Sequence, residues 1–160
     1  MNNDNIRQLD SKVNEYCACY SIRPRFELSD LYNIQTLYDE TQSWPHHLHA
    51  GCYVLYSTDR KLLYVGKAVK LGRRLSNHFR LDEMRNAVTP PWERWSSAPR
   101  LVQAIKVNKF YEASSLEEFL IHELDPPDNS LGRKSGNDVA IEQPMTLNID
   151  CPAHPRTGMR

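Results

Sequence analysis

Apolar residues recur at helical spacing in the first forty residues of the chain. The first pattern places apolar side chains on one face of a helix at Ile6, Leu9, Val13 and Tyr16. It predicts an amphipathic helix within residues 1–20. A second pattern of this kind lies within residues 29–42, with Ser29 as its candidate N-cap. Two helices are therefore expected before the first strand.

The middle of the chain changes to short apolar runs that are typical of strands. Residues 51–56 (GCYVLY) and 61–65 (KLLYV) are separated by a four-residue polar link. A link of this length between two apolar runs predicts a β-hairpin. Gly66 is expected to end its second strand.

Three further elements follow the predicted hairpin. Helical spacing returns in residues 71–81, and apolar and polar residues alternate in residues 101–108 as in a strand. Residues 114–124 form another helical pattern, which Pro126 stops. The irregular segment 85–99 lies between the helical pattern of residues 71–81 and the predicted strand of residues 101–108.

This order of elements predicts an α+β fold, an α/β sandwich in which helices flank a small three-stranded antiparallel sheet. We expect three regions. Residues 1–49 form an N-terminal helical extension, residues 50–130 form the core, and residues 131–160 form an irregular C-terminal tail.

Composition places the chain among ordinary globular proteins. It has 160 residues, of which 40% are hydrophobic and 25% are charged. The sequence has neither a run of about 18 apolar residues nor the basic and apolar start of a secretory signal. We therefore expect a cytoplasmic protein that makes no contact with a membrane.

Charge is balanced overall but divided along the chain. The formal net charge is zero, which argues mildly against a nucleic-acid partner. Residues 60–80, however, contain seven basic residues and no acidic one, while residues 112–128 contain six acidic residues and no Lys or Arg. A protein that binds a polyanion and a metal cation needs both kinds of segment.

Side chains suited to phosphate chemistry lie in these segments. Tyr53 and Tyr64 are on neighbouring strands of the hairpin, so both phenols can reach one region. Arg74 and His78 share a helix face, where an arginine fork suits a phosphate and a histidine can carry a proton. The acidic helix offers Glu117, and one carboxylate with substrate phosphates is a common way to hold Mg²⁺.

Five motif pieces together resemble the GIY-YIG nuclease superfamily, and are most similar to the N-terminal nuclease module of UvrC. They are Gly51-Cys52-Tyr53, Tyr64-Val65-Gly66-Lys67-Ala68, Leu71-Gly72-Arg73-Arg74-Leu75, Leu116-Glu117-Glu118-Phe119-Leu120-Ile121, and Pro126 followed by Asn129. Two residues depart from the motifs. Cys52 replaces Ile or Val, and His78 stands where the repair module tends to carry Tyr and some restriction and homing members carry His.

The resemblance implies a metal-dependent endonuclease that hydrolyses phosphodiester bonds in DNA. Tyr53 would act as general base or orient the attacking water, Arg74 would clamp the phosphate, and Glu117 would bind Mg²⁺ or Mn²⁺. Tyr64 and His78 would assist around the phosphate and the nucleophile. The expected substrate-binding residues are Gly66, Lys67, Lys70, Arg73 and Asn129.

Several alternatives stay open at this point. The fold could be catalytically silent and bind a nucleic acid or a protein instead, and the chain could act as a monomer or as a homodimer. The histidines at 46, 47 and 49 fit a solvated linker better than a metal cluster. Trp92 and Trp95 could stack on bases or anchor their loop on the core, and the second reading is slightly favoured.

Overall fold

A five-stranded antiparallel sheet forms the centre of the computed structural model, which describes residues 4–89 and 95–130. Its main path runs through β1 (Glu27–Leu28), β7 (Leu101–Lys106), β3 (Gly51–Tyr56) and β4 (Leu62–Ala68). Strand β2 (Tyr32–Asn33) also pairs with β7. The three predicted strands are thus present as β3, β4 and β7. The prediction of only three was wrong, because β1 and β2 pair with β7 as well.

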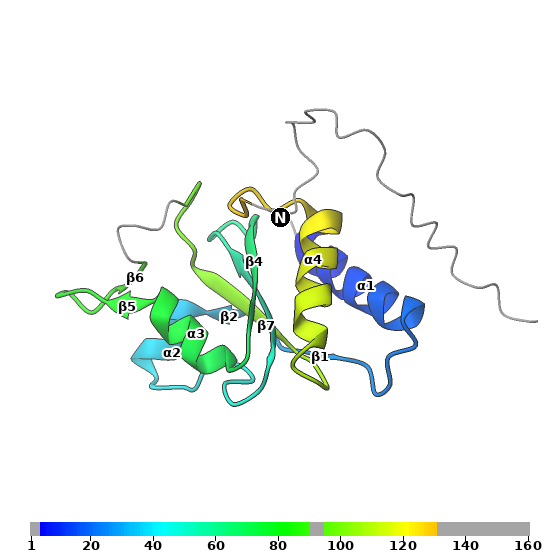
Figure 1. Cartoon of the computed structure of the whole chain (residues 1–160). Coiled ribbons are helices and arrows are strands. Elements are labelled where there is room, and N and C mark those ends of the chain that lie inside the picture. Colours follow the sequence, from blue (N-terminus) through cyan, green and yellow to red (C-terminus); the bar gives the residue numbers. More distant parts are fainter. Residues whose placement is uncertain (1–3, 90–94, 131–160) are drawn as a thin grey trace, which may run out of the picture.

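Helices cover both faces of this sheet (Figure 1). On one face, α1 (Asp4–Cys19) packs against α4 (Glu112–Leu124). On the other lie α2 (Ile34–Asp39) and α3 (Leu71–His78). A separate two-stranded ribbon of β5 (Arg80–Leu81) and β6 (Ala87–Val88) follows α3. The molecule is therefore the α+β sandwich expected from the sequence.

Strand β3 lies between the two layers of helices, and all six of its residues are buried. Alternate side chains of a strand point to opposite faces. Cys52, Val54 and Tyr56 belong to the apolar cluster that includes residues of α1 and α4. Tyr53 and Leu55 belong to the cluster that includes residues of α2 and α3. Burial on both faces explains why this segment is a continuous apolar run rather than an alternating one.

The second predicted helix begins later than its apolar spacing indicates. Helix α2 starts at Ile34, and its N-cap is Asn33, whose side chain accepts hydrogen bonds from the backbone N–H groups of Gln35 and Thr36. Ser29 instead bonds to Ala104 of β7. Its N–H donates to the Ala104 carbonyl at 2.8 Å, and its Oγ accepts from the Ala104 N–H at 2.9 Å. Ser29 as N-cap was therefore wrong.

The second strand of the hairpin continues beyond Gly66. Lys67 pairs with Cys52, and Ala68 pairs with Gly51, so β4 ends at Ala68. Helix α3 in turn ends at His78, and the chain then enters the ribbon. Helix α4 starts two residues before the predicted position.

The predicted N-terminal extension is tied to the core, since its residues supply α1, β1, β2 and α2. The predicted tail, residues 131–160, and Trp92 lie outside the described residues. In the described part of the chain, no helix combines the length and the apolar character needed to span a membrane.

Candidate active site at the edge of the sheet

The two predicted tyrosines meet on the α3 side of the sheet. Tyr53 pairs with Gly66, and Leu55 pairs with Tyr64, which makes the tyrosines diagonal neighbours on one face. Their ring centroids are 6.0 Å apart. A Cβ atom at Gly66 would lie 2.5 Å from the Tyr53 hydroxyl and 2.7 Å from Cε1 of Tyr64. Glycine is therefore required at this position for both rings to lie over the strand.

Helix α3 brings Arg74 and His78 to the same hydroxyl. Arg74 Nε donates a hydrogen bond to the Tyr53 hydroxyl at 3.3 Å, and His78 Nε2 lies 2.7 Å from that oxygen. An arginine can only donate, so the Tyr53 oxygen accepts from Arg74. The direction of the second bond depends on the histidine tautomer: when Nε2 carries no hydrogen, the Tyr53 hydroxyl donates to it. The three side chains form a continuous chain of hydrogen bonds.

Burial governs the protonation of Tyr53. Its side chain is 0% exposed. Removal from water raises the pKa of this phenol well above its usual value, the neighbouring Tyr64 raises it further, and the hydrogen bond from Arg74 lowers it by less. The phenol is therefore neutral at neutral pH. The same hydrogen bond raises the pKa of Arg74, whose guanidinium keeps its charge.

The predicted metal ligand lies on the other side of β4. Glu117 Oε2 forms an ion pair with Lys67 Nζ at 2.7 Å. The Glu117 side chain is 16% exposed and that of Lys67 is 43% exposed. The hydrogen bond with Glu117 raises the pKa of Lys67 above its usual value. Because Tyr64 and Lys67 point to opposite faces of β4, the candidate residues form two groups that meet at this strand.

The donor set at Glu117 is suited to one class of metal ion. Among the described residues, no group of three or more His, Cys, Asp or Glu side chains could hold a metal. Mg²⁺ usually keeps several waters and takes one or two carboxylates together with substrate phosphates. A single half-buried carboxylate is the kind of ligand that such an ion takes.

The histidine-rich segment has a structural role in this part of the chain. The His49 and His47 carbonyls accept hydrogen bonds from the first two N–H groups of α3, at 3.0 Å each. A Cβ atom at Gly72 would lie 2.7 Å from Cβ of His47, so the segment packs closely against the helix. The metal-cluster alternative gains no support here, since these histidines form no such group among the described residues.

Asn129, predicted as a substrate contact, is bonded to the backbone of β4. Its Oδ1 accepts from the Val65 N–H at 2.9 Å, and its Nδ2 donates to the Val65 carbonyl at 2.8 Å. The residue is buried. Its amide therefore supports β4, the strand that separates the two tyrosines on one face from Glu117 on the other.

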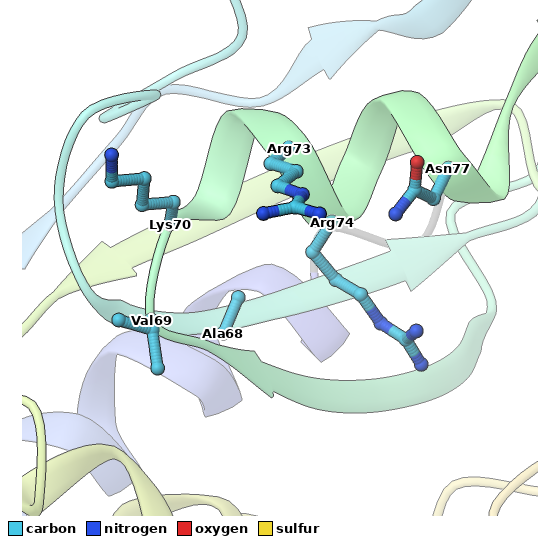
Figure 2. Close-up of a pocket in the computed structure, with 6 residues that line it drawn as sticks. All are labelled: Ala68, Val69, Lys70, Arg73, Arg74 and Asn77. Carbon is cyan, nitrogen blue, oxygen red and sulfur yellow. The ribbon is translucent and has the colours of Figure 1, made fainter.

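The exposed basic residues of α3 surround an open pocket. Lys70, Arg73 and Arg74 line a cavity of about 370 Å³ together with Ala68, Val69 and Asn77. Figure 2 shows Lys70 and Arg74 extending toward opposite sides of this pocket, with Arg73 between them. Arg74 thus contacts Tyr53 and also borders a space that a ligand can enter.

Trp95 joins the site, although the sequence does not predict a catalytic neighbour there. Its ring lies edge-on to Tyr64 at 5.6 Å and to His78 at 6.2 Å between centroids. The next residue, Ser96, donates its N–H to Asp128 at 2.9 Å. Asp128 in turn donates its N–H to the Leu63 carbonyl of β4 at 2.9 Å. These contacts favour the interpretation that Trp95 anchors its loop on the core. The only sequence signal for its place beside the site was an aromatic residue within an irregular loop.

Comparisons with known proteins identify the family of this chain. The model of the UvrC-like GIY-YIG domain family matches residues 49–130. UvrABC system protein C of Borrelia turicatae (strain 91E135) is 33% identical over 132 residues, which is 78% of this chain and 18% of that protein. UvrABC system protein C of Pseudomonas aeruginosa (strain LESB58) is 36% identical over 83 residues, which is 52% of this chain and 13% of that protein. The chain therefore spans less than a fifth of these relatives.

Proposed function

Because the chain belongs to the family of UvrC-like GIY-YIG domains, we propose that it is a metal-dependent endonuclease that hydrolyses phosphodiester bonds in DNA. The observation that supports this most is the hydrogen-bonded chain of Arg74, Tyr53 and His78. It places a fixed cation, a hydroxyl and a proton acceptor side by side. Glu117 lies across the same edge strand and provides a carboxylate for a divalent cation.

Arg74 binds the scissile phosphate. Its guanidinium is charged and exposed, its Nε donates to Tyr53, and Tyr64 interacts with it as well, so the N–H groups directed toward the pocket are those that can meet a ligand. Two such donors match two phosphate oxygens and become more favourable as negative charge grows on the phosphate. Lys70 and Arg73 border the same pocket and attract the adjacent backbone.

Tyr53 and His78 together remove the proton of the attacking water. Since burial keeps the Tyr53 phenol protonated, the oxygen can take a proton only as it passes its own to His78 Nε2. The resulting hydroxide attacks phosphorus, and the bond from phosphorus to one sugar oxygen breaks. Tyr64, half-buried beside both rings, restricts where the water can stand.

Glu117 holds Mg²⁺ or Mn²⁺ in this proposal. Such an ion supplies electrostatic stabilisation of the oxygen that leaves. Lys67 neutralises Glu117 at 2.7 Å. With a divalent cation bound at Glu117, Lys67 would lose its carboxylate partner, and its ammonium could then turn to the phosphate.

The first test is cleavage of supercoiled plasmid, linear duplex and single-stranded DNA with Mg²⁺, with Mn²⁺ and with EDTA. We expect metal-dependent cleavage that Glu117→Gln lowers by about 100-fold or more, the range for losing one electrostatic stabiliser in an active site. The matched control is Glu118→Gln, which removes an equal charge from the exposed neighbouring position and should leave the rate within about twofold.

Two outcomes would count against the enzyme. Absence of cleavage with either metal, or equal cleavage by the parent and Glu117→Gln, favours the catalytically silent binding module instead. Nicks in one strand would indicate a monomeric enzyme. Linear products from a symmetric target would indicate a homodimer with two active sites.

A further inference from the structure

Two neighbouring cavities share the basic residues at the start of α3. The first, beside Arg74, is the pocket of about 370 Å³ described above. The second has about 310 Å³ and lies between α3 and the loop that joins α2 to β3. Its lining residues are Ser43, Trp44, His47, Leu48, Lys70, Gly72, Arg73 and Ser76. Lys70 and Arg73 border both, so the cavities adjoin across one turn of helix.

The charged side chains that line the two cavities are basic. Lys70, Arg73 and Arg74 are all exposed, and among the described residues no Asp or Glu lines either cavity. Cations without intervening acids give a surface that attracts phosphate groups. Figure 2 shows Arg74 at one side of the first cavity and Lys70 at the other, so the path runs from Arg74 toward the second cavity.

The wall of the second cavity is held in place by polar contacts. Trp44 Nε1 donates to Ser76 Oγ of α3 at 2.9 Å, and the Gly72 N–H donates to the His47 carbonyl at 3.0 Å. Leu48 projects from the same loop and is 69% exposed. A rigid wall with one exposed apolar side chain beside two cations suits a ligand with alternating phosphate and apolar parts.

We infer that the DNA strand on one side of the scissile phosphate crosses α3 between Lys70 and Arg73 and enters the second cavity. Residues 43–48 are then part of the DNA-binding surface. This inference rests on the proposed function, since it extends the substrate away from Arg74. Arg74 follows the N-cap Lys70 by four positions, about 6 Å along the helix axis. Measured along the axis of a DNA duplex, that distance corresponds to the rise of about two base pairs.

The test measures DNA binding in a Glu117→Gln background, so that cleavage does not interfere. A fluorescent duplex of 20 base pairs is titrated at several salt concentrations. Removing both cations in Lys70→Ala/Arg73→Ala should weaken binding at least about tenfold and lower the slope of log K against log salt by about two. The matched control is Arg7→Ala/Lys61→Ala, with a change below about twofold. Arg7 lies on α1 at the other face of the sheet, and Lys61 lies before the start of β4.

A second pair of variants examines the new cavity alone. Leu48→Asp places a negative charge at an exposed position that borders only the second cavity. We expect about tenfold weaker binding with an unchanged urea midpoint. Met84→Asp, on the connection within the β5–β6 ribbon and 80% exposed, should have little effect on binding.

The outcomes separate this inference from the proposed function. If the parent cuts DNA but Leu48→Asp binds as tightly as its background, the strand does not enter the second cavity and only the inference fails. If Lys70→Ala/Arg73→Ala weakens binding no more than the control pair, the path across α3 is wrong. If the background protein does not bind the duplex and the parent does not cut it, the proposed function fails as well.

Discussion

At Tyr53, burial and hydrogen bonding act in opposite directions on the same hydroxyl. Removal from water favours the neutral phenol, while the Arg74 donor favours the phenolate, and burial has the larger effect. In the proposed mechanism, the reactivity of this oxygen depends on His78 as the group that would receive its hydrogen. The position of the Tyr53 hydroxyl also depends on Gly66, because any larger side chain there would displace the Tyr53 ring.

Tyr56 allows the effect of burial to be tested away from the site. It is fully buried on the α1–α4 side, donates to Gln103 Oε1 at 3.1 Å, and burial raises its pKa far above the usual value near 10. A group whose folded-state pKa is raised contributes stability below its unfolded pKa and loses it as pH rises. We therefore expect the free energy of unfolding to fall above about pH 10.

The measurement is urea denaturation between pH 9 and pH 11.5, ranges set by the tyrosine reference value. In Tyr56→Phe the decline above about pH 10 should be shallower by up to about 1.4 kcal/mol per pH unit, the contribution of one proton. The variant also loses the Gln103 contact, which lowers stability by about 1 kcal/mol at neutral pH. Equal slopes for parent and variant would show that this phenol ionises in the folded protein.

At the scale of elements, local pattern predicted the central strand β3 better than the helix ends. The apolar run that forms β3 matches the strand at both ends, because every side chain of that strand is buried. Helix α2 begins late because Ser29 is bonded to β7, a contact from a distant part of the chain. Periodicity cannot register such a partner, and the same limitation hid β1 and β2.

Strand β4 depends on Asn129, which carries no charge and comes from the segment after α4. Replacing it in Asn129→Ala leaves both buried polar groups of Val65 without their partner. An unsatisfied buried group costs about 1–3 kcal/mol. We expect a loss of stability in this range, measured by urea denaturation, with Ser130→Ala as the exposed neighbouring control.

Enzyme kinetics separate this role from the substrate contact that the family resemblance implies. A strand-supporting Asn129 should affect the urea midpoint, with KM for DNA changing by less than about twofold. An unchanged urea midpoint together with a raised KM would indicate that Asn129 contacts the substrate.

At the scale of the molecule, the N-terminal segment supports the helix that carries Glu117. Tyr16 of α1 is hydrogen-bonded to Ser115, and its ring lies 5.3 Å from that of Phe119. Lys12 forms an ion pair with Glu123 at 2.8 Å. The sequence predicted α1 as an amphipathic helix but did not indicate its partner. Residues 4–19 thus help to fix α4 against the sheet.

A core substitution in α1 tests this dependence. Leu9 is fully buried, and Leu→Ala changes at such positions cost about 2–5 kcal/mol through lost burial and a residual cavity. We expect Leu9→Ala to lower the free energy of unfolding by this amount, as measured by urea denaturation. Gln8→Ala, at the exposed neighbouring position, should change it by less than about 0.5 kcal/mol. A similarly small effect of Leu9→Ala would show that α1 contributes little to the core.

How far the candidate site can be predicted also depends on scale. The residues from Tyr53 to His78 lie within one hairpin and one helix, so spacing and motif together indicated that they meet. The acidic helix and the family resemblance both indicated Glu117, but neither placed it opposite Lys67, because that position requires the packing of α4. Trp95 belongs to a loop without periodicity, and its contacts with Tyr64 and His78 could not be anticipated.

The amide of Asn129 also determines how copies of this chain can approach one another. Within residues 4–89 and 95–130, no strand pairs with the outer side of β4. An open strand edge invites another chain to extend the sheet, which leads to aggregation. Asn129 occupies both outward groups of Val65, and the charged Lys67 follows two residues later. Edge-to-edge association through β4 is thereby discouraged, and the edge between the Arg74 face and the Glu117 face of this strand stays available to the proposed DNA ligand instead of a strand of protein.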